Sequence, residues 1–253
     1  MTGTDLKGLR AAITGGTSGL GLALVTELLH RGARVAFVAR NREAVERAVK
    51  ERPGVHGIVG DVSRKSDAHP IAIQVLAALG GLDVLVNNAS SLGPVPLVPL
   101  ADTECEDLEL ALATNLLGPF RLTKALLGSL AASARDGRHP LVVNVSSDAA
   151  VTPYPTWGAY GASKAALHHL SRIWDAELSD EGIRVVSMDP GDMDTPLHAL
   201  AVPDADRSTL KRPEAAAREL ADVIVVTYRG PTDAVAAASH GSHGQTRGAE
   251  VLR

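Results

Sequence analysis

The chain has 253 residues, 45% of them hydrophobic, with 25 basic and 29 acidic residues and a formal net charge of −4. This length allows one large α/β domain with a sizeable core, whereas the lack of a basic stripe argues against nucleic-acid binding. The apolar runs are too short for a membrane span, the first ten residues are too polar for a signal peptide, and a single cysteine, Cys105, is typical of a cytoplasmic protein.

Short apolar runs of strand composition alternate along the chain with longer segments of helical periodicity. In chain order, the predicted strands are 10–14, 34–39, 55–59, 82–86, 141–146 and 183–188, and the predicted helices are 20–30, 42–51, 68–79, 103–134, 156–180 and 214–226. This alternation predicts right-handed βαβ units, and therefore a doubly wound parallel sheet in a three-layer α/β/α arrangement.

Three segments depart from the regular pattern. The helix at 103–134 is interrupted at Gly118-Pro119, and 190–213 is a Pro- and Asp-rich irregular stretch. From residue 229 the composition shifts to Gly, Ala, Ser, His and Thr, which predicts a poorly ordered tail. We therefore expect a single domain over 1–228 and a tail over 229–253.

A glycine-rich turn joins the first strand to the first helix. It reads Thr-Gly-Gly-Thr-Ser-Gly-Leu-Gly over 14–21. Gly15 permits a tight turn, Gly19 permits close approach of a pyrophosphate, and Gly21 permits close packing of helix on strand. The free N–H groups of a helix N-terminus favour phosphate. The turn therefore predicts a dinucleotide site, the alternative being a glycine-rich turn without a ligand.

The end of the second strand indicates which dinucleotide is preferred. An acidic residue there would bind the ribose 2′-hydroxyl, whereas an arginine accommodates a 2′-phosphate. This strand is followed by Arg40 and Asn41, with no acid. We expect NADP(H) to be preferred over NAD(H), the alternative being that Arg40 is a solvated surface charge.

Three further residues have the types and spacing of a proton-transfer site. Ser147 is followed 13 residues later by Tyr160, and Lys164 lies four residues beyond it. Residues four apart share one helix face, and a nearby ammonium group lowers the pKa of a phenol. Tyr160 is therefore a candidate proton donor and acceptor near neutral pH, the alternative being an ordinary surface pair.

These motifs, in order and spacing over about residues 7–198, resemble the short-chain dehydrogenase/reductase family in its compact single-domain branch. The resemblance implies a Rossmann-type fold and reversible hydride transfer between nicotinamide and a carbonyl or secondary alcohol. The catalytic residues that it implies are Asn115, Ser147, Tyr160 and Lys164. The cofactor-binding residues are Thr14, Gly15, Thr17, Ser18, Gly19, Leu20, Gly21, Arg40, Asn41, Asp61, Val62, Asn88, Ala89, Tyr160, Lys164, Pro190, Gly191, Met193 and Thr195.

The resemblance also implies a role for each catalytic residue. Tyr160 would donate the proton, Ser147 would hydrogen-bond the substrate oxygen, and Lys164 would lower the pKa of Tyr160 and hold the ribose. Asn115 would anchor a water that relays protons to Lys164, the alternative being a hydrogen bonder at the helix break.

Two departures from the family pattern stand out. Ser90 replaces the usual glycine of the Asn-Asn-Ala-Gly element. We also find no seventh strand with a Gly-Gly element near the C-terminus. Because family tetramers often use that region, we expect a homodimer through the two long helices rather than a homotetramer.

Segments 90–99, 153–157 and 192–213 should line the substrate site, with Ser147, Tyr154, Trp157 and Met193 as candidate contacts. They lack a cluster of Arg or Lys before Arg207, so we expect a small, largely apolar ketone, aldehyde or secondary alcohol. Its identity, the reaction direction and the stereochemistry stay open.

No metal site is predicted. Adjacent His168 and His169 do not share a helix face, and His240 and His243 lack supporting ligands.

Two alternatives to a carbonyl reductase or alcohol dehydrogenase are considered. One is a catalytically silent NADP-binding regulator or scaffold, which the intact Ser147, Tyr160, Lys164 and Asn115 argue against. The other is epimerisation or dehydration of a nucleotide sugar, for which too little chain follows Thr195.

Overall fold

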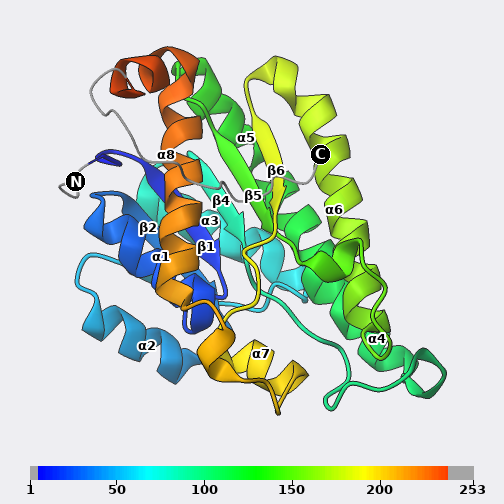
Figure 1. Cartoon of the computed structure of the whole chain (residues 1–253). Coiled ribbons are helices and arrows are strands. Elements are labelled where there is room, and N and C mark those ends of the chain that lie inside the picture. Colours follow the sequence, from blue (N-terminus) through cyan, green and yellow to red (C-terminus); the bar gives the residue numbers. More distant parts are fainter. Residues whose placement is uncertain (1–4, 239–253) are drawn as a thin grey trace.

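A six-stranded, all-parallel sheet forms the centre of the molecule (Figure 1), in a computed structural model that describes residues 5–238. The strands are β1 Arg10–Thr14, β2 Arg34–Ala39, β3 His56–Val59, β4 Val84–Asn87, β5 Leu141–Val145 and β6 Arg184–Met188. Their order in the sheet is β3-β2-β1-β4-β5-β6. The order reverses between β1 and β4, which is the signature of a doubly wound sheet.

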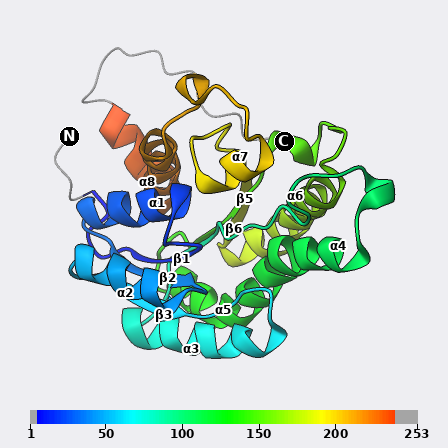
Figure 2. The same ribbon diagram turned by 90° about the horizontal axis from the view of Figure 1, so that it is seen from below.

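Helices connect the strands and cover both faces of the sheet. They are α1 Gly19–His30, α2 Arg42–Glu51, α3 Ala68–Leu79, α4 Cys105–Leu112, α5 Gly118–Arg135, α6 Gly158–Leu178, α7 Pro196–Ala201 and α8 Pro213–Ala238. Figure 2 shows α1 and α8 on one side of the sheet and α3 and α5 on the other. The predicted three-layer α/β/α fold is confirmed.

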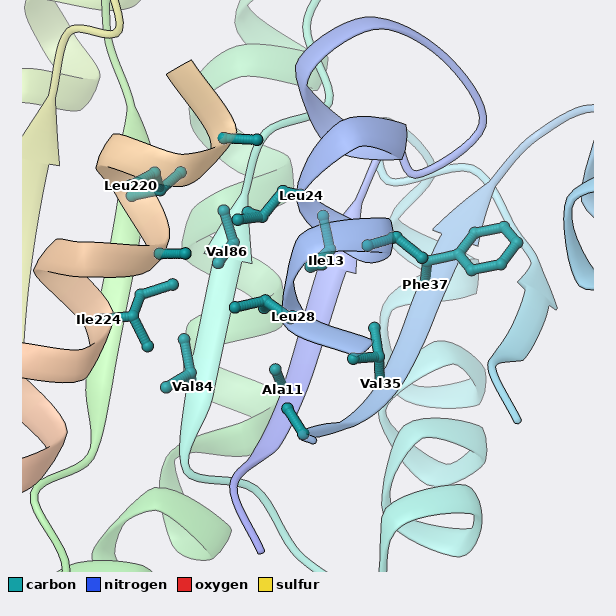
Figure 3. Packing of buried hydrophobic residues seen from close by; sticks show 14 of the residues in the cluster. Ala11, Ile13, Leu24, Leu28, Val35, Phe37, Val84, Val86, Leu220 and Ile224 are labelled. Carbon is teal, nitrogen blue, oxygen red and sulfur yellow. The ribbon is translucent and has the colours of Figure 1, made fainter. Parts of the chain in front are cut away.

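Alternation along the strands divides the core into two clusters. In β1, Ile13 belongs to the cluster under α1 and α8, whereas Ala12 belongs to the cluster under α3 and α5. Figure 3 shows Leu24 of α1 and Leu220 of α8 packed over the first of these faces. Because successive side chains of a strand point to opposite faces, a sheet buried on both sides needs continuous apolar runs.

The structure corrects the prediction in two connecting regions. The predicted break at Gly118-Pro119 is instead a π-helical turn at Ala113–Leu117. Gly118 begins α5, and Pro119 lies in its first turn, where proline is favoured because its missing N–H costs no hydrogen bond. The stretch 190–213, predicted to be irregular, contains α7, whose N-cap Thr195 accepts a hydrogen bond from the His198 N–H at 3.2 Å.

The expected boundary between domain and tail falls within a helix. Helix α8 continues to Ala238, so the boundary at residue 228 falls inside it. The rest of the predicted tail, 239–253, lies outside the described residues. Within 5–238, no helix is both long enough and apolar enough to span a bilayer.

Candidate active site

The carboxyl ends of the strands open onto a cleft of about 650 Å³. Ligands of doubly wound sheets bind at this edge, where the strand order reverses. The predicted site residues that line the cleft are Gly15, Thr17, Ser18, Gly19, Leu20, Arg40, Asn41, Asp61, Val62, Asn88, Ala89, Ser147, Tyr154, Trp157, Tyr160, Lys164, Pro190, Gly191, Met193 and Thr195. The predicted residues Thr14, Gly21 and Asn115 are not part of this lining.

The glycine-rich turn has the shape that a pyrophosphate requires. Gly15 has a positive φ of 73°, which glycine adopts without strain. A side chain at Gly21 would collide with the main-chain oxygen of Gly15 and with Asn88 Nδ2. The N-cap of α1, Ser18, makes no side-chain capping bond, so the first turn of the helix keeps N–H groups for an anion. The turn therefore fits a dinucleotide.

Thr14 and Asn88 tie this turn to the loop after β4. Thr14 Oγ1 accepts hydrogen bonds from the N–H groups of Asn88 and Ala89, both at 3.0 Å. Asn88 Nδ2 donates to the Thr14 carbonyl at 2.9 Å. The two strands beside the strand-order reversal are thereby held in register where the cleft begins.

After β2 and β3, polar side chains fix the shape of the loops that line the cleft, and Arg40 stays exposed. Asn41 caps α2 by accepting from the Ala44 N–H at 2.8 Å, and Asp61 accepts from the N–H and Oγ of Ser63. Arg40 is exposed and forms no ion pair with any residue that the structure describes. It can therefore pair with an anionic group of a ligand.

Helix α6 brings Tyr160 and Lys164 together at the opposite end. Both side chains are buried, with 7% and 2% of their surface exposed. Lys164 Nζ donates to the Val145 carbonyl at 2.7 Å and lies 5.5 Å from the centre of the Tyr160 ring. The Trp157 ring meets the Tyr160 ring edge-on at 5.7 Å and helps to fix its orientation.

Burial, more than pairing, sets the charge states of these two groups. It raises the pKa of Tyr160 to about 12 and lowers the pKa of Lys164 to about 8. The expected lowering of the Tyr160 pKa by Lys164 is therefore not found for the protein's own groups. Interactions with Ser147 and Ser90 lower the pKa of this phenol, whereas the nearby Asp189 carboxylate raises it.

Ser147 is held by its neighbours on the chain. Its Oγ donates to Asp148 Oδ1 at 3.0 Å and accepts from the Ala149 N–H at 3.2 Å. The other oxygen of Asp148 accepts from the Tyr154 hydroxyl at 2.6 Å. Ser147 also lowers the pKa of the Tyr160 phenol, and both residues line the cleft.

Asn115 is placed apart from this group by the π-helical turn. Its Oδ1 accepts from the Ser91 N–H at 2.8 Å and the Ser90 hydroxyl at 3.2 Å. Its Nδ2 donates to the Ser91 carbonyl and to Ser163 Oγ, each at 2.8 Å. The side chain is thus saturated and has no capacity for a water, so the expected relay could pass only through its main chain.

Sequence reasoning missed two carboxylates that line the cleft, Asp148 and Asp189. Asp189 accepts from the Gly191 N–H at 2.9 Å, and burial raises the pKa of its carboxyl. A carboxylate placed directly before Pro190, at the end of a buried strand, was the available signal for Asp189. Ser90 belongs to the predicted lining segment 90–99, but no role was predicted for its hydroxyl.

Helix α7 forms an apolar wall beside the reacting groups. Its Leu197 and Ala201 pack against the cluster of Leu92, Ala149 and Tyr160. Met193 lines the cleft and also packs against the core beneath α1 and α8. Within residues 5–238, no group of three or more His, Cys, Asp or Glu side chains is arranged to hold a metal ion.

Comparisons with known proteins give one consistent family. Residues 10–206 match the family model described as short chain dehydrogenase. The chain is 34% identical over 195 residues to 2,5-dichloro-2,5-cyclohexadiene-1,4-diol dehydrogenase of Sphingobium indicum, covering 77% of this chain and 76% of the relative. It is 31% identical over 229 residues to glucose 1-dehydrogenase of Gluconobacter oxydans, covering 86% and 84%.

Solved structures agree with these relatives. A 3-ketoacyl-(acyl-carrier-protein) reductase from Brucella melitensis, complexed with NADH, has a TM-score of 0.80 at 26% identity and covers 86% of this chain and 90% of its own. A short chain dehydrogenase from Burkholderia cenocepacia, in complex with NADP, has a TM-score of 0.77 at 25% identity, with 90% and 94% covered.

Proposed function

The chain belongs to the short-chain dehydrogenase/reductase family of NAD(P)-dependent oxidoreductases acting on CH–OH groups, and from this premise we propose that it interconverts a small ketone or aldehyde with its alcohol, using Tyr160 as the proton donor. One observation carries the proposal. Tyr160, Lys164 and Ser147 line the same cleft as the glycine-rich turn, and Lys164 Nζ lies 5.5 Å from the centre of the Tyr160 ring.

Each residue has a defined part in the proposed reaction. A nicotinamide cofactor bound in the cleft would supply or accept the hydride. In the reducing direction the Tyr160 hydroxyl gives its proton to the carbonyl oxygen, which leaves a phenolate. Ser147 hydrogen-bonds the same substrate oxygen and stabilises the charge that develops on it. Lys164, mostly protonated at pH 7 with a pKa of about 8, offsets the charge of the phenolate.

We propose NADP(H) as the preferred cofactor. Arg40 is exposed at the end of β2, where it can pair with a 2′-phosphate, and no acid stands there to bind a 2′-hydroxyl. The two solved relatives are complexed one with NADH and one with NADP, so the preference rests on Arg40 alone.

We propose an uncharged, largely apolar substrate. Trp157, Leu92 and Leu197 supply apolar surface near Tyr160. Asp148 and Asp189 place negative charge beside them, which disfavours carboxylate or phosphate substituents. Turnover should be faster for a neutral ketone than for its carboxylated analogue.

Tyr160→Phe tests the proposed reaction. The variant should lose at least about 100-fold in kcat with an accepted carbonyl, because the proton donor is gone, while it binds NADPH as before. Loss of reduced-cofactor absorbance gives the rate, and fluorescence titration gives binding. A variant as fast as the parent would refute Tyr160 as the donor, and a parent that binds NADPH but reduces no carbonyl in a broad panel would favour the catalytically silent alternative.

A further inference from the structure

Ser90 is hydrogen-bonded to Asn115 and lines the same cleft as Tyr160. Ser90 follows β4 and lines the cleft. Its Oγ donates to Asn115 Oδ1 at 3.2 Å, and its nearness lowers the pKa of the Tyr160 phenol. Ser147 is the other hydroxyl residue that lowers the pKa of this phenol. Two serines from different strand ends therefore act on the pKa of Tyr160.

The asparagine in this arrangement is held independently of Ser90. Asn115 Oδ1 accepts the Ser91 N–H at 2.8 Å, a shorter bond than the 3.2 Å bond from Ser90. Asn115 Nδ2 donates to Ser163 Oγ, which in turn donates to the main-chain carbonyl of Tyr160 at 2.7 Å. If the Ser90 hydroxyl turns away, Asn115 keeps all its other bonds and no buried group loses its only partner.

A serine hydroxyl has a single proton, so Ser90 can donate to Asn115 or to Tyr160 but not to both. While Tyr160 is protonated it carries no charge that needs a donor, and Ser90 can donate to Asn115. Once Tyr160 has given that proton to the substrate oxygen, the phenolate is an anion in a buried site. A hydrogen bond to an ionised acceptor is roughly twice as strong as a neutral one, so the donor then favours Tyr160.

We propose that Ser90 is a second hydroxyl donor to the Tyr160 phenolate, switching its proton from Asn115 to Tyr160 as the reaction proceeds. This deepens the proposed function and rests on it. No proton leaves Ser90: the Tyr160 O–H bond breaks, the substrate gains that proton, and Ser90 only rotates. In alcohol oxidation the phenolate must form first, and Ser90 stabilises it there too.

Ser90→Ala is the direct test. Without the second donor the pKa of Tyr160 should rise by about half to one unit, and the acidic limb of kcat for alcohol oxidation should move by the same amount toward higher pH. At pH 7 kcat should fall about three- to tenfold with little change in KM. Ser90→Thr keeps the hydroxyl and should restore the parent profile.

A second readout does not depend on turnover. Ultraviolet absorbance of phenolate after a rapid pH jump, with Tyr160→Phe as the reference, reports the pKa of Tyr160 directly. Ser90→Gly, which carries the residue more usual in the family, should give the same shift as Ser90→Ala. Ser91→Ala is the matched control, because Ser91 Oγ only accepts from the Gly93 N–H at 3.3 Å and lies outside the cleft lining.

The outcomes separate this inference from the proposed function. An unchanged titration and pH profile in both Ser90→Ala and Ser90→Gly would overturn the inference alone, as would an equal shift in Ser91→Ala. A shifted titration in a protein that reduces no carbonyl would support the contact between Ser90 and Tyr160 and overturn the reaction.

Discussion

At the scale of single residues, desolvation decides the chemistry of the cleft. Lys164 is four residues from Tyr160 and close to its ring, as the spacing predicts. Yet burial shifts the pKa of each group in the direction that favours its neutral form. The Lys164 charge that the spacing suggested is not among the main causes of the Tyr160 shift, whereas interactions with Ser147 and Ser90 offset part of the effect of burial.

The buried Lys164 predicts an unusual dependence of stability on pH. Its pKa falls from 10.5 in the unfolded chain to about 8 in the folded protein, which corresponds to roughly 3 kcal/mol of destabilisation when it is protonated. Between pH 8 and 10.5 only the unfolded chain holds this proton, so the free energy of unfolding rises with pH across that window.

Lys164→Met removes the cost of burying a charged ammonium group but also removes the hydrogen bond to the Val145 carbonyl, which costs about 1 to 2 kcal/mol. The variant should therefore be more stable than the parent by about 1 to 2 kcal/mol at pH 7, and should lose this advantage by pH 10. Urea unfolding at both pH values gives the comparison. Lys50→Met, at an exposed position of α2, serves as the control. A constant difference between Lys164→Met and the parent across this range would contradict the assignment.

Arg40 carries the prediction on cofactor preference. Arg40→Asp should weaken NADPH binding by about 10- to 100-fold, because a charge-assisted hydrogen bond of about 1.5 to 3 kcal/mol is lost, and should change NADH binding much less. Titration calorimetry with both cofactors measures this. Arg42→Asp, two residues further along and also exposed, should have a small effect. Equal losses for NADPH and NADH in Arg40→Asp would remove the basis for preferring NADP(H).

At the scale of elements, the connections were harder to predict than the strands and helices. The apolar runs predicted β1, β2 and α2 with their observed bounds. The π-helical turn before α5 has no such pattern, because it depends on Asn115 bonding to a loop 24 residues earlier. Helix α7 was missed because it is short and follows Thr195, whose capping role depends on its conformation.

We propose that the long helices α5 and α6 form the contact of the homodimer expected from the sequence. Leu117, next to α5, and Ile173 of α6 are 39% and 43% exposed although they lie on the helices expected to pair. Leu117→Asp and Ile173→Asp together should shift the protein from dimer to monomer in sedimentation velocity, because charge is placed in an apolar contact. Ile73→Asp on α3, where the parent side chain is 67% exposed, should leave the dimer intact. A monomeric parent would exclude this interface.

At the scale of the whole molecule, the fold and most of the cleft lining followed from sequence, because each depends on local patterns. Alternating strands and helices imply a parallel sheet, and the glycine-rich turn must then lie at its carboxyl edge. The contacts that tune the reaction did not follow. Ser90 meets Asn115 across 25 residues, and Asp189 reaches the cleft from the last strand. These contacts depend on the tertiary structure, and no local sequence pattern predicts them.

The reversal of strand order between β1 and β4 has a consequence for protein engineering. Arg40 belongs to the half formed by β1, β2 and β3, whereas Ser90, Ser147 and Tyr160 belong to the other half. A hybrid protein that takes residues 1–60 from a relative of opposite coenzyme preference should therefore have the relative's coenzyme preference and the parent's alcohol specificity.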